Sequence, residues 1–402
     1  MKMRILIVNT CYYPDVQGGA EYSVKKLAEQ LVSEGHRVLV LCSDSRTVTE
    51  TVNGVRVHRH RFHSVYHRLG NDSRSFAEKL GRHALDTCNP LNAHALEQII
   101  GHFRPDVIHT NNLYEITPQI WLTAKKFGVP VVHTLRDYAL LCPRTTLTHA
   151  DGSPCGKPNP VCAAHRAACK AASAAVMAVT APSEMMLERF AEEGFFPKAS
   201  KQTVPNAADF DPETVARLCR EKRTGETVTF VFLGTLSEHK GVRVLLDAFG
   251  LFGKSDPSVR LVIAGKGELE DMVKTAAAHD SRITYAGFLN ETEVGELLVG
   301  CDVLVCPSVW NEPFGRVVLD AYKHGLPVIA SRAGALPETV TDGVTGVLVP
   351  QSDTAALHRA MNRMTDHSLL EKMRTAIPEK LAPYSLSSQS RCFTSIYLRV
   401  LT

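Results

Sequence analysis

Residues 302–330 read DVLVCPSVWNEPFGRVVLDAYKHGLPVIA, and this stretch decides the fold. The apolar run 302–306 has the length of a buried strand, and the run 326–330 is a second strand candidate. Between them, apolar residues fill much of 317–322, a segment that ends at Gly325 and suits a helix. A strand, a tight loop, a helix and a further strand form a βαβ unit of a parallel sheet.

The loop of this unit has the features of an anion-binding turn. Pro313 suits the first turn of a helix, where its missing N–H costs nothing, and Gly315 allows a ligand to approach the backbone. We expect the free N–H groups of that turn to favour an anion. Glu312 would precede the turn, and Asp320 would lie about two turns, roughly 10 Å, further along. Two carboxylates around such a turn suit a sugar nucleotide, whose hydroxyls flank a diphosphate.

Strand-length runs recur along the whole chain and alternate with segments of helical length. This alternation predicts an α/β fold with parallel sheets and helices on both faces. The predicted strands are 5–9, 37–41, 106–109, 129–134, 176–181, 229–233, 260–264, 283–286, 302–306, 328–331 and 346–349.

The pattern restarts at Thr229 after the polar linker 220–226, which favours two Rossmann-like domains facing each other across a cleft. We expect an N-terminal domain over 1–203, a C-terminal domain over 204–384, and a final helix, 385–402, that packs back on the N-terminal domain.

Composition excludes several classes of protein. The chain has 402 residues, 44% hydrophobic and 22% charged, and its net charge of +3 is too mild to indicate a nucleic-acid partner. No apolar run reaches the roughly 20 residues that span a bilayer. Residues 1–8 suit a strand rather than a signal peptide, so we expect a cytoplasmic protein with reduced thiols. Peripheral contact with the inner face of a membrane remains open.

Polar residues at predicted strand ends are the site candidates of the N-terminal domain, because ligands of open α/β sheets bind there. They are His109, Asn111, His133, Arg136 and Asp137. The alternative is a buried histidine bonded to backbone and a structural Arg–Asp pair. Gly18 and Gly19, at a helix start, suit close approach of a phosphate, although plain turn chemistry explains them equally well.

Two further segments have open interpretations. Residues 56–74 are rich in Arg and His, which indicates either a solvated face or a basic lip that meets an anionic acceptor or a membrane. A Pro-rich loop contains four cysteines, which could bind zinc or an iron–sulfur cluster, or could be reduced, packed thiols. These cysteines are Cys142, Cys155, Cys162 and Cys169, and they lack a Cys-x-x-Cys pair.

In the C-terminal domain, two loops follow the first two predicted strands. The loop 234–241 contains Thr235 and Lys240, and Lys240 is either a point charge for a phosphate or simply solvated. The loop 265–268 begins at Gly265 and would come close to a nucleoside.

Taken together, these motifs give a resemblance that covers nearly the whole chain. The sequence resembles retaining glycosyltransferases of family 4, also described as glycosyl transferases group 1, which have the GT-B fold. The motifs are Gly18-Gly19-x-Glu21, Pro105-Asp106-Val107-Ile108-His109, Val204-Pro205-Asn206, Lys240-Gly241, Ala264-Gly265-x-Gly267-Glu268, Pro307-Ser308, Glu312-Pro313-Phe314-Gly315 with an acid at position 320, Gly334-x-x-Pro337-Glu338, and Asp342-Gly343-x-Thr345-Gly346.

The resemblance implies a role for each candidate. Glu312 bonds hydroxyls of the donor sugar, Asp320 holds the ribose, and Lys240 neutralises the β-phosphate. The implied site comprises Glu312, Lys240, His133 and Arg136 as catalytic residues, Gly18, Gly19, Thr235, Gly265, Phe314, Gly315, Arg316 and Asp320 as donor-binding residues, and His109, Asn111 and Asp137 on the acceptor side.

Three positions depart from the family pattern. The second glutamate of the family is Asp320 here, and the arginine that usually follows the glycine of the donor phosphate loop is Thr235. The histidine often found before the Asp-Tyr or Asp-Trp pair is Arg136, which cannot act as a neutral imidazole.

The implied activity is transfer, with retention, of a hexose-type sugar from a UDP- or GDP-sugar to a saccharide or lipid-linked acceptor in the synthesis of cell-surface polysaccharides or glycoconjugates. No metal or cofactor is needed, because the lysine and helix N-termini stabilise the leaving diphosphate. The alternative, favoured by the three departures, is a catalytically silent GT-B module that binds a nucleotide or a partner enzyme.

Overall fold

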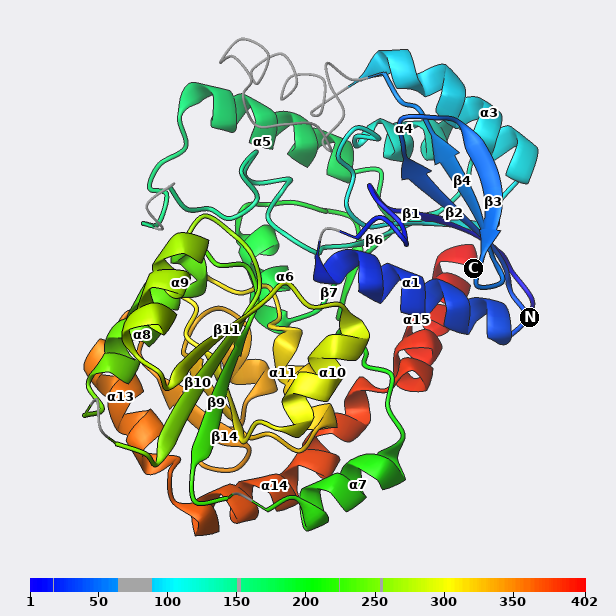
Figure 1. Ribbon diagram of the computed structural model, residues 1–402. Helices are drawn as coiled ribbons and strands as arrows, with labels where there is room; N and C mark the ends of the chain where they lie inside the picture. The colour runs from blue at the N-terminus through cyan, green and yellow to red at the C-terminus, as the bar shows by residue number, and fades with distance from the viewer. Residues whose placement is uncertain (17, 64–88, 150–152, 224, 254–255) are drawn as a thin grey trace. The chain divides into compact units, whose positions relative to one another are not determined.

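The computed structural model describes residues 1–16, 18–63, 89–149, 153–223, 225–253 and 256–402 (Figure 1). Residues 64–74 of the Arg/His-rich segment therefore lie outside the described residues. The chain divides into two compact units. The N-terminal unit comprises Met1–Leu147, Cys155–Ala207 and Leu386–Thr402, and the C-terminal unit comprises Thr148–Pro154 and Ala208–Ser385.

The N-terminal unit is built on an eight-stranded sheet with the order β3-β4-β2-β1-β5-β6-β7-β8. Every neighbouring pair is parallel except β3 and β4, which form an antiparallel hairpin at one edge. Its elements are β1 Arg4–Val8, α1 Gly19–Ser33, β2 Arg37–Ser43, β3 Val48–Val52, β4 Val55–His60, η1 Pro90–Asn92, α3 Ala93–Phe103, β5 Val107–Thr110, α4 Gln119–Lys126, β6 Val131–Thr134, α5 Pro160–Ser173, β7 Ala178–Ala181, α6 Glu184–Glu192, β8 Ser200–Thr203 and α15 Leu386–Leu401.

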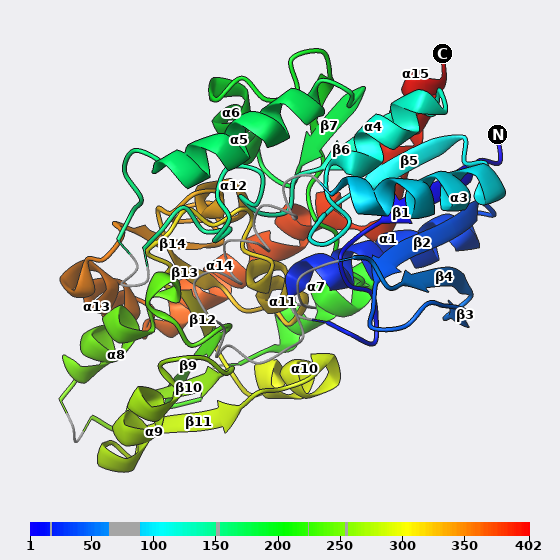
Figure 2. The ribbon, with the colours of Figure 1, turned by 90° about the horizontal axis from the view of Figure 1, so that it is seen from above.

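Helices α1 and α15 cover one face of this sheet and lie against each other (Figure 1). Alternate residues of β1, Ile5 and Ile7, contribute to the hydrophobic core beneath them, because successive side chains of a strand point to opposite faces. Phe393 and Ile396 of α15 belong to the same core. The last helix of the chain therefore completes the N-terminal unit, whereas helices α3 and α4 pack together on the opposite side of the sheet (Figure 2).

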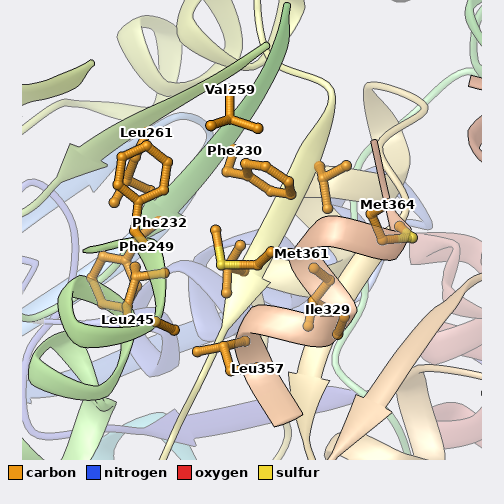
Figure 3. Close-up of a cluster of buried hydrophobic side chains, with 14 of the residues drawn as sticks. Phe230, Phe232, Leu245, Phe249, Val259, Leu261, Ile329, Leu357, Met361 and Met364 are labelled. Carbon is orange, nitrogen blue, oxygen red and sulfur yellow. The ribbon is translucent and has the colours of Figure 1, made fainter. Parts of the chain in front are cut away.

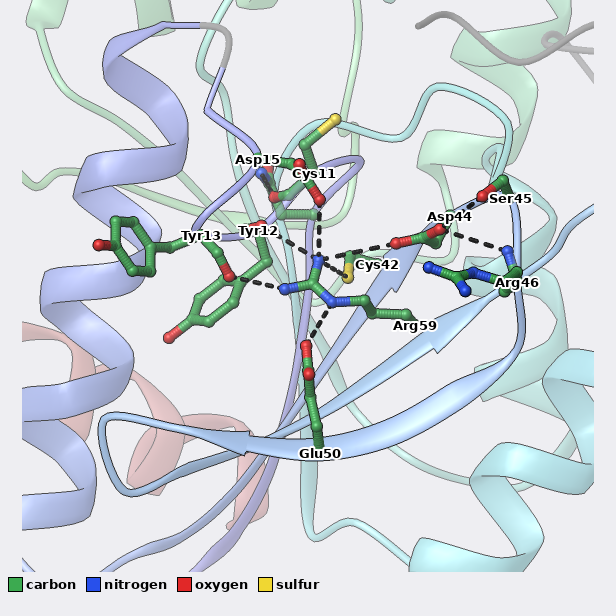
Figure 4. Close-up of polar contacts among 11 residues, drawn as sticks. Cys11, Tyr12, Tyr13, Asp15, Cys42, Asp44, Ser45, Arg46, Glu50 and Arg59 are labelled. Carbon is green, nitrogen blue, oxygen red and sulfur yellow. Dashed lines mark hydrogen bonds and ion pairs between the residues drawn. The ribbon is translucent and has the colours of Figure 1, made fainter.

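A buried arginine, Arg59 on β4, fixes the loop that follows β1 (Figure 4). Its Nη1 donates to the carbonyl oxygen of Tyr12 at 3.2 Å, and its Nη2 donates to that of Tyr13 at 2.7 Å. Its Nε donates to Glu50 on β3 at 2.6 Å, and Asp15 lies 3.4 Å away. The expectation that this segment is a solvated face or a basic lip of a cleft was therefore wrong for Arg59. Its charge is paired with acids, and its N–H groups donate to backbone carbonyl oxygens of the loop after β1.

Replacement of Arg59 by methionine is expected to lower the free energy of unfolding by about 1–2 kcal/mol. The acids that pair with Arg59 are partly exposed and can be rehydrated, so the loss is smaller than the roughly 3–5 kcal/mol of a fully buried pair. Urea unfolding of the variant checks this value, with Arg56→Met, at an exposed position of the same strand, as the control. Equal losses of stability in the two variants would contradict the role of Arg59 in fixing the loop after β1.

The C-terminal unit contains a six-stranded, all-parallel sheet with the order β11-β10-β9-β12-β13-β14. Its elements are α7 Pro212–Glu221, β9 Val228–Leu233, η2 Glu238–Lys240, α8 Val242–Gly250, β10 Val259–Ala264, α9 Glu270–His279, β11 Ile283–Gly287, α10 Glu291–Val299, β12 Val303–Cys306, α11 Val317–Lys323, β13 Val328–Ser331, α12 Leu336–Thr339, β14 Gly346–Val349, α13 Thr354–Arg363, α14 His367–Leu381 and η3 Ala382–Tyr384.

Two hydrophobic clusters sandwich this sheet. One cluster joins the strands to α8, α9 and α13, and it includes Phe230, Phe249 and Met361 (Figure 3). The other joins the opposite face to α7, α10 and α11 through residues such as Leu319 and Tyr322. Both faces are therefore buried, which explains why the strands read as nearly continuous apolar runs.

Candidate active site

The strand order of the C-terminal unit places its binding site. The chain proceeds outward from β9 to β11 and then returns to β12 on the other side of β9. The chain therefore leaves the adjacent strands β9 and β12 in opposite directions. This is a topological switch point, where open α/β sheets bind ligands. The loops after these two strands are 234–241 and 307–316, and they are joined where the Val309 N–H donates to the carbonyl oxygen of His239 at 3.0 Å.

Lys240 and Glu312 form an ion pair at this point. The Nζ of Lys240 lies 2.5 Å from Oε1 of Glu312, and the Oγ of Ser308 donates to the same oxygen at 2.9 Å. The ammonium also lies 4.9 Å from the ring centre of Trp310, within cation–π range. Glu312 is 6% exposed, so the two loops hold a carboxylate and a cation that are partly shielded from solvent.

The carboxyl group of Glu312 is ionised in this setting. Burial alone would raise its pKa, but the charge of Lys240 and the hydrogen bonds from Lys240 and Ser308 outweigh burial, so the pKa lies below its ordinary value. By contrast, burial raises the pKa of the nearby Cys306 thiol to about 12, so this thiol stays protonated and acts as a packed apolar group.

Two glycines allow the loops to meet so closely. At Gly334, φ is +57°, and a Cβ would lie 2.4 Å from the carbonyl oxygen of Glu312. The next N–H, of Ala335, donates to that same oxygen at 2.8 Å. At Gly241, φ is +75°, and a Cβ would lie 1.9 Å from the carbonyl oxygen of Pro307. The backbone of the loop 307–316 is therefore held from two sides.

The helix after this loop begins later than the sequence indicated. Helix α11 starts at Val317, so Pro313 lies in the loop rather than in a first turn, and Asp320 lies within the first turn instead of two turns along. The N–H groups of Val318 and Leu319 already donate to the carbonyl oxygens of Gly315 and Arg316. The prediction that Pro313 lies in the first helical turn was wrong, because Gly315 has a φ of +81°, which a right-handed helix does not allow, so the helix starts only after it.

The other donor-side candidates lie on the same edge of the C-terminal sheet. Thr235 follows β9 and is exposed, and Gly265 follows β10, where a Cβ would lie 1.8 Å from the carbonyl oxygen of Gly234. Phe314 is buried in the core between β12 and α11, so only its backbone can meet a ligand. Asp320 is partly exposed on α11.

The depressed pKa of Glu312 predicts how stability depends on pH. Because its pKa in the folded protein is below the unfolded value of about 4.3, its contribution is complete above pH 4.3 and is lost as pH falls through the folded value. The difference in unfolding free energy between the wild type and Glu312→Gln is therefore expected to shrink when urea unfolding is repeated at successively lower pH below 4.3. A difference that grows on acidification would contradict an ionised Glu312.

A second site candidate is a cavity of about 220 Å³ within the N-terminal unit, at the ends of β5 and β6. Of the predicted residues, Asn111, His133, Arg136 and Asp137 line it. The Nε of Arg136 donates to Oδ1 of Asn111 at 3.0 Å. Residues from α5, including His165, close another side. The structure thus brings four predicted residues, from the ends of two neighbouring strands, into one cavity.

His109 is placed differently from the other N-terminal candidates. It is fully buried, with Nδ1 2.7 Å from the Tyr397 hydroxyl and Nε2 2.6 Å from the Thr134 hydroxyl. Both ring nitrogens are thus occupied within the fold, and the histidine ties β5 to α15. His133 bonds Thr110 through Nδ1 at 2.9 Å, and burial lowers its pKa to about 3, so its ring is neutral.

Gly18 and Gly19 lie at the start of α1. The Gly18 N–H donates to the carboxylate of Glu21 at 2.9 Å, which caps the helix. Among the described residues, no three His, Cys, Asp or Glu side chains are grouped as metal ligands would be, so the zinc or iron–sulfur hypothesis for Cys142, Cys155, Cys162 and Cys169 finds no support. Within the described ranges, none of the helices is both long and apolar enough to cross a bilayer.

Comparison with known proteins agrees with this geometry. Residues 220–380 match the family described as glycosyl transferases group 1, and residues 18–207 match the glycosyl transferase 4-like domain. The chain belongs to the group 1 glycosyltransferases. Both candidate regions, the switch-point loops and the cavity, fall within the matched segments.

Relatives of this glycosyltransferase share most of its length. An uncharacterised 42.6 kDa protein in the cps region of Klebsiella pneumoniae is 31% identical over 84% of this chain and 87% of its own. Glycogen synthase of Mycobacterium tuberculosis is 28% identical over 90% and 86%. The Anabaena protein HepE, solved in complex with UDP-glucose, matches with a TM-score of 0.69 and 18% identity over 98% and 99%. This last likeness shows the GT-B fold.

The two candidate regions, one in each unit, also contain residues to which sequence reasoning assigned no role. Ser308 and Trp310 contact the Lys240–Glu312 pair, and Tyr114 and His165 line the N-terminal cavity. Ser308 and Trp310 were visible as neighbours of Glu312 in the deciding stretch. His165 had no such signal, because it comes from a helix 29 residues beyond Arg136.

Proposed function

We propose that this glycosyltransferase moves a hexose-type sugar from a UDP- or GDP-sugar to a saccharide or lipid-linked acceptor, with retention of anomeric configuration and without a metal. The observation that supports this most directly is the Lys240–Glu312 pair at the switch point of the C-terminal unit. A cation and an ionised carboxylate on adjoining loops match the two ends of a donor: an anionic phosphate and a hydroxyl-rich sugar.

In the proposed reaction, the bond between the anomeric carbon and the diphosphate breaks, and the acceptor oxygen forms a bond to that carbon on the same face. The acceptor proton passes to the departing phosphate oxygen. Lys240 stabilises the negative charge of that diphosphate, together with backbone N–H groups of the loop 314–316. Glu312 accepts hydrogen bonds from the sugar hydroxyls, and Asp320 accepts those of the ribose.

The remaining predicted residues keep their proposed roles. Gly18 and Gly19 contact the diphosphate, Thr235 and Gly265 contact the donor nucleotide, and Asn111 and Asp137 serve the acceptor. His133 and Arg136 keep their proposed catalytic role, in contact with the substrates. His109 is the exception: with both ring nitrogens occupied, we assign it to positioning β5 rather than to contact with the acceptor.

The comparisons supply the biological setting of the proposal. The Klebsiella pneumoniae relative lies in a cps region, and the HepE structure contains UDP-glucose. The likeness to HepE supports a nucleotide-sugar donor, for which we propose uridine or guanosine as the base, and the cps-region relative supports a role in synthesis of a cell-surface polysaccharide or glycoconjugate. We place the reaction in the cytoplasm, with peripheral membrane contact where the acceptor is lipid-linked.

A panel of UDP-, GDP- and ADP-sugars tests the proposal. The correct donor, at 100 times its Kd, should stabilise the protein by about 2.7 kcal/mol in thermal unfolding. Adding a saccharide or lipid-linked acceptor should then release the nucleotide, with and without EDTA alike. Absence of binding to any member of the panel would overturn the proposal. Binding without release, with every acceptor in a host lysate, would instead favour a catalytically silent module.

A further inference from the structure

The cavity of the N-terminal unit contains a guanidinium whose hydrogen bonds are incomplete. Arg136 donates from Nε to Asn111 and from Nη1 to Oδ1 of Asn206. Its Nη2 is buried and has no hydrogen-bond partner. Arg136 lines the cavity, so this unmatched donor group belongs to a side chain that adjoins the empty volume.

No acid neutralises this guanidinium among the described residues. None of the ion pairs in that part of the chain involves Arg136, and its two bonded partners are neutral amides. Glu21 of α1 acts on it only at longer range, and its carboxylate accepts the Gly18 N–H. Burial lowers the pKa of Arg136 to about 10, so it remains a cation at neutral pH.

The other titratable groups of the cavity leave room for an anion. Burial lowers the pKa values of His133 and His165, so both rings are neutral near pH 7. Asp137 is the opposing charge, but one of its oxygens accepts the Ala139 N–H at 2.8 Å and the other lies 3.4 Å from the Tyr114 hydroxyl. Asp137 is therefore held by an N–H of its own loop and by Tyr114 of the loop after β5.

A buried charged donor without a partner is costly, and a ligand, an ion or a water molecule that completes it is one explanation of such a group. The volume of about 220 Å³ is smaller than the roughly 300–1,000 Å³ of sites for drug-sized ligands. It suits one charged sugar unit rather than a whole nucleotide. Leu135 and Leu140 add the apolar surface that a sugar ring can contact.

We propose that this cavity binds the carboxylate or phosphate of an anionic saccharide substrate, with Arg136 Nη2 as the group that recognises the charge. The inference rests on the proposed function, since it specifies the acceptor class of that transferase: an acidic sugar, either a uronic acid or a sugar phosphate. The Nη2 group carries two N–H donors on a guanidinium that is cationic at neutral pH, so it can donate charge-assisted hydrogen bonds to either oxyanion.

Binding of isolated sugars tests the inference without any transfer. D-glucuronate, D-glucose 6-phosphate, D-glucose and UDP are titrated separately into the full-length protein at constant ionic strength, and Kd is measured by NMR. The wild type should bind glucuronate or glucose 6-phosphate at least 10-fold more tightly than glucose. Preference for the first identifies a uronic acid, and preference for the second identifies a phosphate.

Variants locate the binding to Arg136. Arg136→Gln should raise the Kd of the favoured acidic sugar about 10- to 100-fold and leave the Kd of glucose unchanged. Arg136→Lys should give an intermediate Kd, because lysine keeps the charge but lacks the planar donors of a guanidinium. Arg37→Gln, at an exposed position of the same unit, should match the wild type. Melting temperatures show whether each variant is folded. If Arg136→Gln does not fold, Arg136→Lys provides the comparison with the wild type.

The outcomes separate this inference from the proposed function. Equal affinity for glucose and both acidic sugars, or an unchanged Kd in Arg136→Gln, would overturn the cavity assignment even if donor turnover succeeds. If Arg136→Gln weakened only the binding of UDP, the assignment would also be overturned, because the guanidinium would then bind the donor diphosphate. Conversely, Arg136-dependent binding of an acidic sugar would support the cavity even if no donor in the panel is turned over.

Discussion

Glu312→Gln is expected to lower kcat/KM for sugar transfer about 100- to 1,000-fold. Hydrogen bonds to an ionised partner each contribute roughly 1.5–3 kcal/mol, and we propose that Glu312 accepts such bonds from the donor sugar. Glutamine has nearly the same shape and can still accept the Ser308 hydroxyl, so the loop should keep its conformation. The effect should therefore come from the lost charge rather than from lost packing.

Steady-state kinetics with the donor identified in the panel measure this loss. Glu296→Gln removes a carboxylate from an exposed position on α10 of the same unit and should leave kcat/KM within about twofold. If Glu312→Gln retains a third or more of wild-type activity while Glu296→Gln behaves as expected, Glu312 does not contact the reacting sugar.

Gly334→Ala is expected to destabilise the protein by about 3–5 kcal/mol and to abolish transfer. The new Cβ would lie 2.4 Å from the oxygen and 2.5 Å from the nitrogen of Glu312, and both atoms belong to the backbone and cannot rotate away. The φ of +57° adds the cost of a left-handed conformation, about 1–2 kcal/mol for a residue with a side chain. Relief of the clash requires the Glu312 backbone to move.

Gly343→Ala is the matched control for this substitution. Gly343 has a similar φ of +73°, but a Cβ there would meet nothing within 4 Å. Its cost should be limited to the left-handed conformation, about 1–2 kcal/mol, with donor turnover retained. Similar losses of stability in the two variants would show that the contact with Glu312 adds nothing to the backbone strain.

Much of the fold followed from local pattern. All eleven predicted strands correspond to strands in the structure, because buried parallel strands read as short apolar runs. The other three strands are β3, β4 and β8. Strands β3 and β8 lie at sheet edges and are largely exposed, with sequences VTETV and SKQT that carry no apolar run, and β4 alternates buried residues with more exposed ones. Edge strands form through pairing with a neighbour, which is information that their own residues do not contain.

The candidate site was predictable to the level of its loops. Lys240 and Glu312 are 72 positions apart, yet both follow strands, and strand order brings their loops together. The later start of α11 was not predictable, because Pro313 fits a helix start as well as it fits a loop. The burial of Arg59 depended on acids from β3 and the loop after β1, which composition could not place.

The position of α15 has a consequence for how the protein is made. The N-terminal unit needs Tyr397 to pair with His109 and Phe393 to close its core, but these residues are synthesised only after the whole stretch Ala208–Ser385 of the C-terminal unit. The intervening stretch Ala208–Ser385 takes roughly 10–35 s to synthesise at about 5–20 residues per second. During that interval the nascent first unit exposes the apolar surface that α15 will cover, so we expect it to need protection by chaperones until α15 has been synthesised.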